Sequence, residues 1–95
     1  MSEAQIEAKM VREIKKRGGL CYKFVSPGNA GVPDRIVITS DGRVIFVELK
    51  TEIGRLAKIQ KWQIEEMRER HADVRVLKGW EEIRLFIEEV FSVGV

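Results

Sequence analysis

The sequence predicts one α/β domain, with a mixed central sheet flanked by helices. Three observations support this fold class. The 95 residues, 44% of them apolar, suffice for one core. A hairpin signal lies near the middle of the chain, and segments with helical periodicity flank it. The expected order is α-β-β-β-α-β-α over residues 1–95, with no linker or repeat that would indicate a second domain.

The first helix is expected over residues 3–17. Its apolar residues Ile6, Met10 and Ile14 recur at four-residue spacing, and Gly18-Gly19 follows as a stop signal. This pattern is typical of an amphipathic helix with one face on the core.

Two further helices are expected in the second half of the chain. Residues 55–70 follow Gly54, and a last helix begins at Gly79. The inward side chains should be Leu56, Ile59, Ile64 and Met67 in the former, and Trp80, Ile83, Ile87, Val90 and Phe91 in the latter.

Four segments favour strands. Residues 20–25 are rich in aromatic and β-branched side chains and end in a cluster of turn formers at 26–31. Residues 35–39 and 43–49 flank a turn, and residues 74–77 alternate apolar and polar side chains. Because apolar residues fall on both faces of the two hairpin arms, we expect these strands to be central and covered on both sides.

The hairpin turn decides which residues share a face. A two-residue turn at Asp41-Gly42 would pair Arg35 with Glu48 and place Asp34 on the wrong face. A three-residue loop, with Gly42 left-handed in a bulge, would instead pair Asp34 with Glu48. We predict the second register, because it places Asp34, Glu48 and Lys50 on one face.

These three side chains suit metal-assisted hydrolysis of a phosphodiester. Two carboxylates that converge on one point are a good start for Mg²⁺ or Mn²⁺, which prefer oxygen ligands and keep several waters. Lys50 would orient the attacking water or stabilise the developing charge. Buried charges of this kind are costly unless they pair with one another, or with a cation and an anionic substrate.

Gly31-Val32-Pro33-Asp34, followed at fourteen residues by Glu48-Leu49-Lys50, resembles the PD-(D/E)xK nuclease superfamily and its VRR-NUC branch, the virus-type replication-repair nucleases. The resemblance covers about residues 3–90 and is closest to compact stand-alone members from phages and bacteria. It implies a restriction-endonuclease-like αβββαβ core with a C-terminal helix, and a homodimer that cuts branched DNA such as four-way (Holliday) junctions with Mg²⁺ or Mn²⁺. It also implies that the backbone carbonyl of Leu49 is a metal ligand beside Asp34 and Glu48.

The resemblance further implies two supporting polar residues in the site. Glu7 lies within the apolar stripe of the first helix, and Gln60 lies between Leu56 and Ile64 on the buried side of the second. A first-helix glutamate helps to hold metal or water in the family, and a glutamine after the Glu-x-Lys strand lines the site. Glu3 is a rival for the first role, and we prefer Glu7.

Basic and aromatic residues outside the site suggest contacts with DNA and with a second copy. The net charge is only +2, so the distribution of charge matters more than the total. Trp62 lies opposite the apolar stripe of its helix and could stack on an unpaired base or bury itself in a dimer contact; we favour the dimer contact. The residues expected to contact DNA are Lys9, Arg12, Lys16, Asn29, Arg55 and Lys58.

We therefore expect a divalent-metal-dependent DNA endonuclease that acts on branched DNA. No segment of the sequence resembles a signal peptide or a membrane span, so we expect a soluble protein in the cytoplasm of a bacterium or a phage-infected host cell. Two symmetric cuts in a junction favour a homodimer. The alternative is a non-catalytic DNA-binding module that docks a partner nuclease, and the complete Asp34, Glu48 and Lys50 set argues against it.

Overall fold

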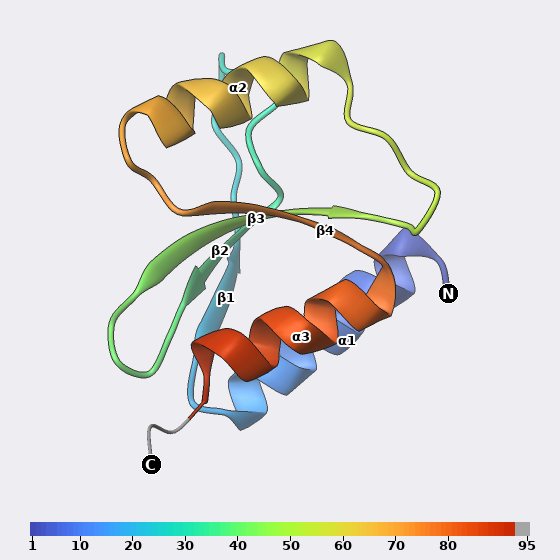
Figure 1. Cartoon of the computed structure of the whole chain (residues 1–95), viewed down its shortest axis with the longest axis vertical. Coiled ribbons are helices and arrows are strands. Elements are labelled where there is room, and N and C mark those ends of the chain that lie inside the picture. Colours follow the sequence, from blue (N-terminus) through green and yellow to red (C-terminus); the bar gives the residue numbers. More distant parts are fainter. Residues whose placement is uncertain (93–95) are drawn as a thin grey trace.

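The computed structural model describes residues 1–92 and has the expected order of elements (Figure 1). One four-stranded sheet has the strand order β1-β2-β3-β4. β1 and β2 pair antiparallel, as do β2 and β3, whereas β3 and β4 run parallel. The elements are α1 (Glu3–Lys16), β1 (Leu20–Lys23), β2 (Arg35–Ile38), β3 (Val44–Lys50), α2 (Lys58–Glu69), β4 (Val74–Lys78) and α3 (Gly79–Val90).

Helices cover both faces of the sheet, as Figure 1 shows. α1 and α3 pack side by side on one face, and α2 lies on the other. The main core fills the layer under α1 and α3, and the described residues form no second core of similar extent under α2. Its buried residues are Ile6, Met10, Ile14, Val37, Ile45, Val47, Leu49, Leu77, Ile83, Phe86, Ile87 and Val90.

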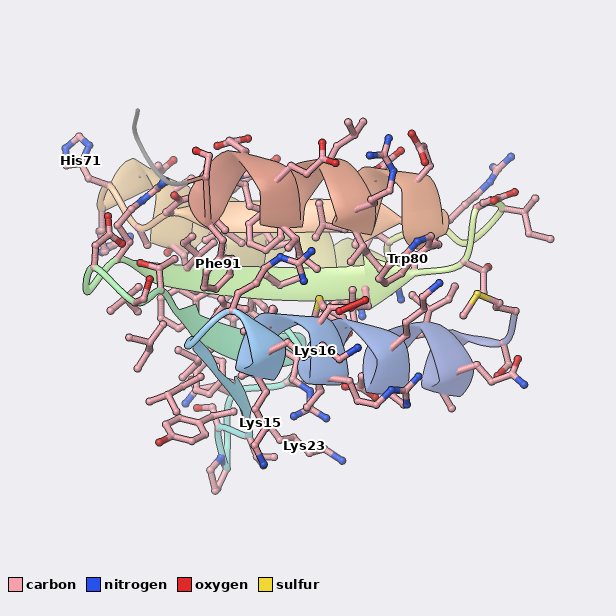
Figure 2. All side chains as sticks on the ribbon, turned by 90° about the horizontal axis from the view of Figure 1, so that it is seen from below. Lys15, Lys16, Lys23, His71, Trp80 and Phe91 are labelled. Atoms are coloured by element: carbon pink, nitrogen blue, oxygen red, sulfur yellow. The ribbon has the colours of Figure 1, made fainter. Side chains whose placement is uncertain are left out.

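Trp80 and Phe91 close the two ends of the seam between α1 and α3 (Figure 2). Any side chain at Gly19 would collide with the Phe91 ring and with Ile14. Glycine is therefore required there to let the end of α1 approach α3, in addition to marking the stop of the helix.

The hairpin has the predicted register. Arg35 pairs with Val47 and Ile38 with Val44. Thr39 and Arg43 then close a three-residue loop, in which Gly42 has a φ of 90°. This left-handed residue is the one that the three-residue loop requires. Continued by one residue, the same register places Asp34 opposite Glu48.

Two details of α2 differ from the sequence-based expectation. The helix begins at Lys58 instead of residue 55, because Gly54 closes a turn onto Thr51 and the segment up to Ala57 stays extended. Ile59 was expected to face inward, but 46% of its surface is exposed. With the later start, Gln60, Ile64 and Met67 lie toward the sheet, and Ile59 is turned toward the loop before β2.

The expectation that the hairpin is covered on both sides holds for only part of it. Val37, Ile45 and Val47 point toward α1 and α3 and have no exposed surface. On the other face α2 packs against β4. Val44 in β3, and Leu20 and Tyr22 in β1, each keep about half of their surface exposed there. The described helices are too short and too polar for any of them to cross a membrane.

Candidate active site

Asp34 and Glu48 meet at the end of the hairpin nearest α2. The backbone N–H of Leu49 donates to Oδ2 of Asp34 at 3.0 Å, which ties the Asp34 carboxylate to β3. The backbone carbonyl of Asp34 accepts from the N–H of Phe24 at 2.8 Å. Asp34 is thus fixed from both neighbouring strands, although it precedes the first residue of β2.

Glu48 lies within β3 and is 1% exposed. Its Oε2 accepts a hydrogen bond from Nε2 of Gln60 at 3.2 Å and lies 3.4 Å from Nζ of Lys50. Its Oε1 is buried and has no hydrogen-bond partner within residues 1–92. A buried carboxylate oxygen without a partner is costly, so this atom is suited to a ligand that brings positive charge.

The protonation of Glu48 reflects this environment. The pKa of Glu48 is raised from 4.5 to about 7; burial is the largest cause, the negative charge of Asp34 also raises it, and Lys50 lowers it. A carboxyl group in this range is neutral or charged according to what binds beside it. A divalent cation at Oε1 would favour the charged form and release the proton.

Gln60 connects the second helix to the site. Its Oε1 accepts from the backbone N–H of Ala57 at 2.8 Å, and its Nε2 donates to Glu48. The amide therefore caps the first turn of α2 and orients the buried carboxylate at the same time. The predicted group of Asp34, Glu48, Lys50 and Gln60 is brought together on one face.

The donor set fits a metal ion that keeps part of its water shell. No three His, Cys, Asp or Glu side chains gather into a metal-binding group within the described part of the chain. The protein would supply the two carboxylates of Asp34 and Glu48, with the Leu49 carbonyl as a further candidate. Mg²⁺ is commonly held by one or two carboxylates together with water and phosphate oxygens.

Glu7 is not brought to this group. Its Oε2 accepts from Nε of Arg35 at 2.8 Å, and the Arg35 side chain also reaches the backbone carbonyl of Cys21. Since Arg35 follows Asp34 in an extended chain, its side chain points to the face under α1. The negative charge of Glu3, by contrast, contributes to the raised pKa of Glu48.

Arg35 itself was missed by the sequence reasoning. The sequence contained a signal for this pair. Arg35 follows Asp34 in a strand, so its side chain points to the opposite face of the sheet, and Glu7 lies within the apolar stripe that must pack on that face. Their ion pair spans 28 residues of sequence and has side chains 17% and 30% exposed. It fastens α1 to the start of β2, directly beside the Asp34 backbone.

The residues predicted to contact DNA fall into two groups. Lys16 lies on the outer surface of α1 in Figure 2, on the layer that faces away from α2. Arg12, also on α1, is exposed. The ammonium of Lys9, on the same helix, lies 4.0 Å from the ring centroid of Trp80. Lys58 is exposed at the start of α2, the helix that contacts Glu48 through Gln60, and Arg55 is exposed in the segment before this helix.

The loop before Asp34 is held against α2. Nε2 of Gln63 donates to the Ala30 carbonyl at 3.2 Å. Any side chain at Gly31, whose φ is 87°, would meet the backbone carbonyl of Ile59. Asn29 stays exposed at the tip of this loop, with its amide bonded to Ser26.

On the outer side of α2, Trp62 is 54% exposed.

Comparison with known proteins gives a consistent result. No protein-family model matches the sequence. A protein named "Putative nuclease p44", from Acyrthosiphon pisum secondary endosymbiont phage 1, is 56% identical over 48 residues, which are 50% of this chain and 52% of that protein. The chain thus spans about half the length of this curated relative.

Two solved structures share the fold over almost the whole chain. One, described as "VRR_NUC domain protein", is 21% identical with a TM-score of 0.74 and covers 99% of this chain and 91% of its own. The other, described as "VRR_NUC domain", has a TM-score of 0.84 and is 30% identical. It covers 90% of this chain and 94% of its own. On this match over nearly all of both sequences, the chain belongs to the VRR-NUC family of nuclease domains.

Proposed function

We propose that this protein is a divalent-metal-dependent DNA endonuclease whose active site is formed by Asp34, Glu48 and Lys50. The observation that carries the proposal is the buried Oε1 of Glu48, which has no hydrogen-bond partner among residues 1–92 and lies beside a second carboxylate and a lysine. A protein that only binds DNA has no use for a buried carboxylate held without a partner, because burying it destabilises the fold.

Asp34 and Glu48 would hold Mg²⁺ or Mn²⁺, with the Leu49 carbonyl as a third protein ligand. When bound, the ion supplies positive charge to the scissile phosphate and lowers the pKa of a coordinated water. Lys50 is 3.4 Å from Glu48 and only 16% exposed as a side chain, so its ammonium is directed at the site instead of at solvent. It would orient the attacking water or stabilise charge on the phosphate oxygens.

The supporting residues keep these groups in place. Gln60 fixes the Glu48 carboxylate through one hydrogen bond and the start of α2 through another. Glu7 and Arg35 would act on Asp34 from the opposite face, as positioning residues. Arg55 and Lys58 are the cations best placed to contact the DNA backbone near the site.

We further propose that the enzyme acts as a homodimer on branched DNA. The half-covered sheet face supports this, because Leu20, Tyr22 and Val44 are apolar and half exposed beside α2. A second copy could cover them, with Trp62 at the margin of the contact. Two symmetry-related sites would then make the two cuts that a four-way junction requires.

Cleavage of labelled DNA tests the proposal. Four-way-junction, flap and linear duplex DNA are incubated with Mg²⁺, Mn²⁺ or EDTA, beside the Glu48→Ala variant. We expect metal-dependent cleavage that prefers the branched DNA and that the variant loses. Binding of these DNAs without cleavage under either metal would contradict the enzyme and favour a DNA-binding module. Light scattering that finds only particles of the 10.9 kDa chain at micromolar concentrations would contradict the homodimer.

A further inference from the structure

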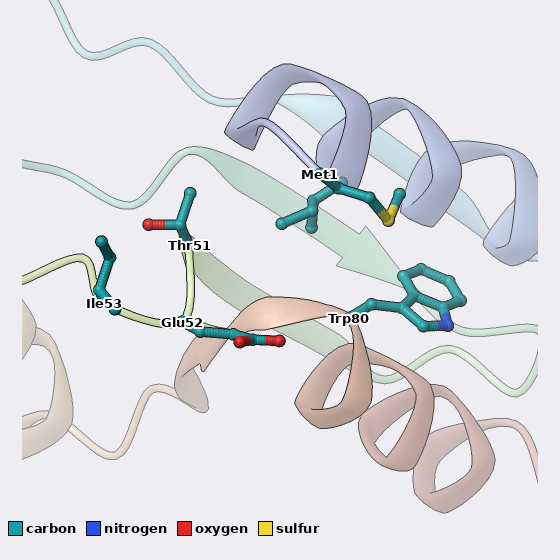
Figure 3. A pocket seen from close by; sticks show the side chains of 6 residues that line it. Met1, Thr51, Glu52, Ile53 and Trp80 are labelled. Carbon is teal, nitrogen blue, oxygen red and sulfur yellow. The ribbon is translucent and has the colours of Figure 1, made fainter.

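A cavity of about 400 Å³ opens at the end of the sheet where the parallel strands β3 and β4 finish (Figure 3). It lies between the start of α1, the loop after Lys50 and the start of α3. Its volume is within the range of pockets that bind small molecules. The lining residues are Met1, Ile6, Thr51, Glu52, Ile53 and Trp80.

The cavity adjoins the candidate active site. Thr51 follows Lys50 directly, and successive Cα atoms are about 3.8 Å apart. On the other side of the cavity, Glu3 follows Met1 by two residues, and its charge is felt by Glu48. The site lies on the α2 face and the cavity opens on the side of α1 and α3, so a DNA strand with a phosphate at Asp34, Glu48 and Lys50 would reach the cavity by passing the end of the sheet.

The walls suit a flat, uncharged ring. Ile6, Met1 and Ile53 offer apolar surface, and the Ile53 side chain is 90% exposed at the rim. Trp80 contributes an indole, which the Lys9 ammonium holds at 4.0 Å from the ring centroid. A nucleobase stacks favourably on such a ring, whereas a phosphate gains little from apolar walls.

Glu52 gives the cavity a hydrogen-bond acceptor. Figure 3 shows its side chain extending from the loop toward the start of α3. The stem of Glu52 fills the space that a side chain at Gly79 would occupy, so this glycine makes room for it. Glu52 is exposed, and its carboxylate takes part in no hydrogen bond or ion pair with another side chain or backbone group of residues 1–92. A carboxylate repels phosphate and accepts from the ring and exocyclic N–H groups of bases, as acidic residues do with the amino group of cytosine.

We propose that this cavity binds an unpaired, amine-bearing nucleobase next to the cut position, with Trp80 stacking on the base and Glu52 accepting from its amino group. The proposal rests on the proposed function, and it gives that function a source of structure selectivity. A base at a branch point is available without the cost of opening a duplex, so branched DNA fills the cavity more readily than linear duplex does.

Fluorescence of 2-aminopurine, an amine-bearing base, tests the proposal. The base is placed in turn at each unpaired position of a flap DNA, with Ca²⁺ in place of Mg²⁺ to permit binding without cleavage. We expect quenching on binding at one position only, which Trp80→Leu removes. At that position we expect cytosine to bind about tenfold more tightly than an abasic nucleotide, and Glu52→Gln to reduce this preference, because a neutral amide oxygen accepts a weaker hydrogen bond than a carboxylate does.

Glu81→Gln is the matched control, since Glu81 lies in the first turn of α3 and does not line the cavity. It should keep both the quenching and the base preference. Equal affinity for cytosine and abasic DNA at every position would overturn the cavity's role even if the DNA is cut. Quenching that is unchanged in a Trp80→Leu protein of native-like thermal stability would also overturn it, as would a base preference that is unchanged in a Glu52→Gln protein of native-like thermal stability. Absence of any DNA binding would overturn the nuclease as well.

Discussion

The two faces of the sheet differ in burial and in polarity, although the same strands supply both. Under α1 and α3, Val37, Ile45 and Val47 are fully buried and apolar. Under α2, the next residue of β3 is Glu48, and Val44 near the other end of the strand is half exposed. The face under α1 and α3 supplies the main apolar core. The face under α2 contains a buried charged side chain and is only partly covered. Functional sites commonly carry this kind of local cost, which the rest of the fold must offset.

The largest expected effect concerns Lys50 on the polar face. Lys50→Ala should lower the cleavage rate at least about a hundredfold, because no other cation lies within reach of Glu48 in residues 1–92. Lys78→Ala is a matched control, since Lys78 pairs with Lys50 in the parallel register and points to the same face. Single-turnover cleavage measures both variants. Equal losses in the two would show that the charge of this region matters and that the position of Lys50 does not.

The apolar face should respond in stability. Ile45→Ala removes a fully buried side chain and should lower the free energy of unfolding by about 2–5 kcal/mol. Val44→Ala, one residue earlier and half exposed on the other face, should cost less than about 1 kcal/mol. Urea titrations of the two variants compare the faces directly. A cost at Val44 as large as that at Ile45 would mean that the polar face is packed in solution, for example by a second copy.

The pH dependence of stability should reveal the cost of Glu48. Its pKa rises from 4.5 to about 7 on folding, so the folded state favours the protonated form. In EDTA, the contribution of Glu48 to stability is therefore full below about pH 4.5 and is lost as the pH rises through 7, by about 3 kcal/mol in total. Glu48→Gln should lack this loss and be the more stable protein at pH 8. Parallel pH profiles for wild type and variant would contradict the raised pKa.

The smallest expected effects separate Glu3 from Glu7. Glu7→Gln breaks the ion pair with Arg35 and should cost about 1–2 kcal/mol of stability, with a modest loss of cleavage. Glu3→Gln should leave stability within about 0.5 kcal/mol, because Glu3 is exposed, and should lower cleavage more than Glu7→Gln does. Unfolding and cleavage assays on the two variants decide the order. A larger cleavage loss in Glu7→Gln would restore Glu7 as the first-helix residue of the site.

The sequence was sufficient for the register of the hairpin and for much of the candidate site. A left-handed Gly42 suits both the two-residue and the three-residue turn. The need for Asp34, Glu48 and Lys50 to share one face selected the three-residue loop, which the structure has. Gln60 was found because the family resemblance implies a glutamine after the Glu-x-Lys strand, and this amide lies on a buried helical stripe.

Other features depend on tertiary distances that periodicity does not contain. The Glu7 and Arg35 pair joins residues from different layers, and the late start of α2 follows from the turn at Gly54. The cavity at Trp80 was also missed. Its walls come from three segments far apart in sequence, and Trp80 alone reads as an ordinary core residue.

Binding of Mn²⁺ tests the central claim most directly. Electron paramagnetic resonance counts the free ion as the protein is titrated at pH 8, in wild type and in Glu48→Gln. We expect one bound ion per chain in the wild type and a loss of affinity of at least about tenfold in the variant. Wild-type affinity should fall as the pH drops below about 7, as Glu48 takes up its proton. Equal Mn²⁺ binding by the two proteins at pH 8 would contradict a metal site at Glu48.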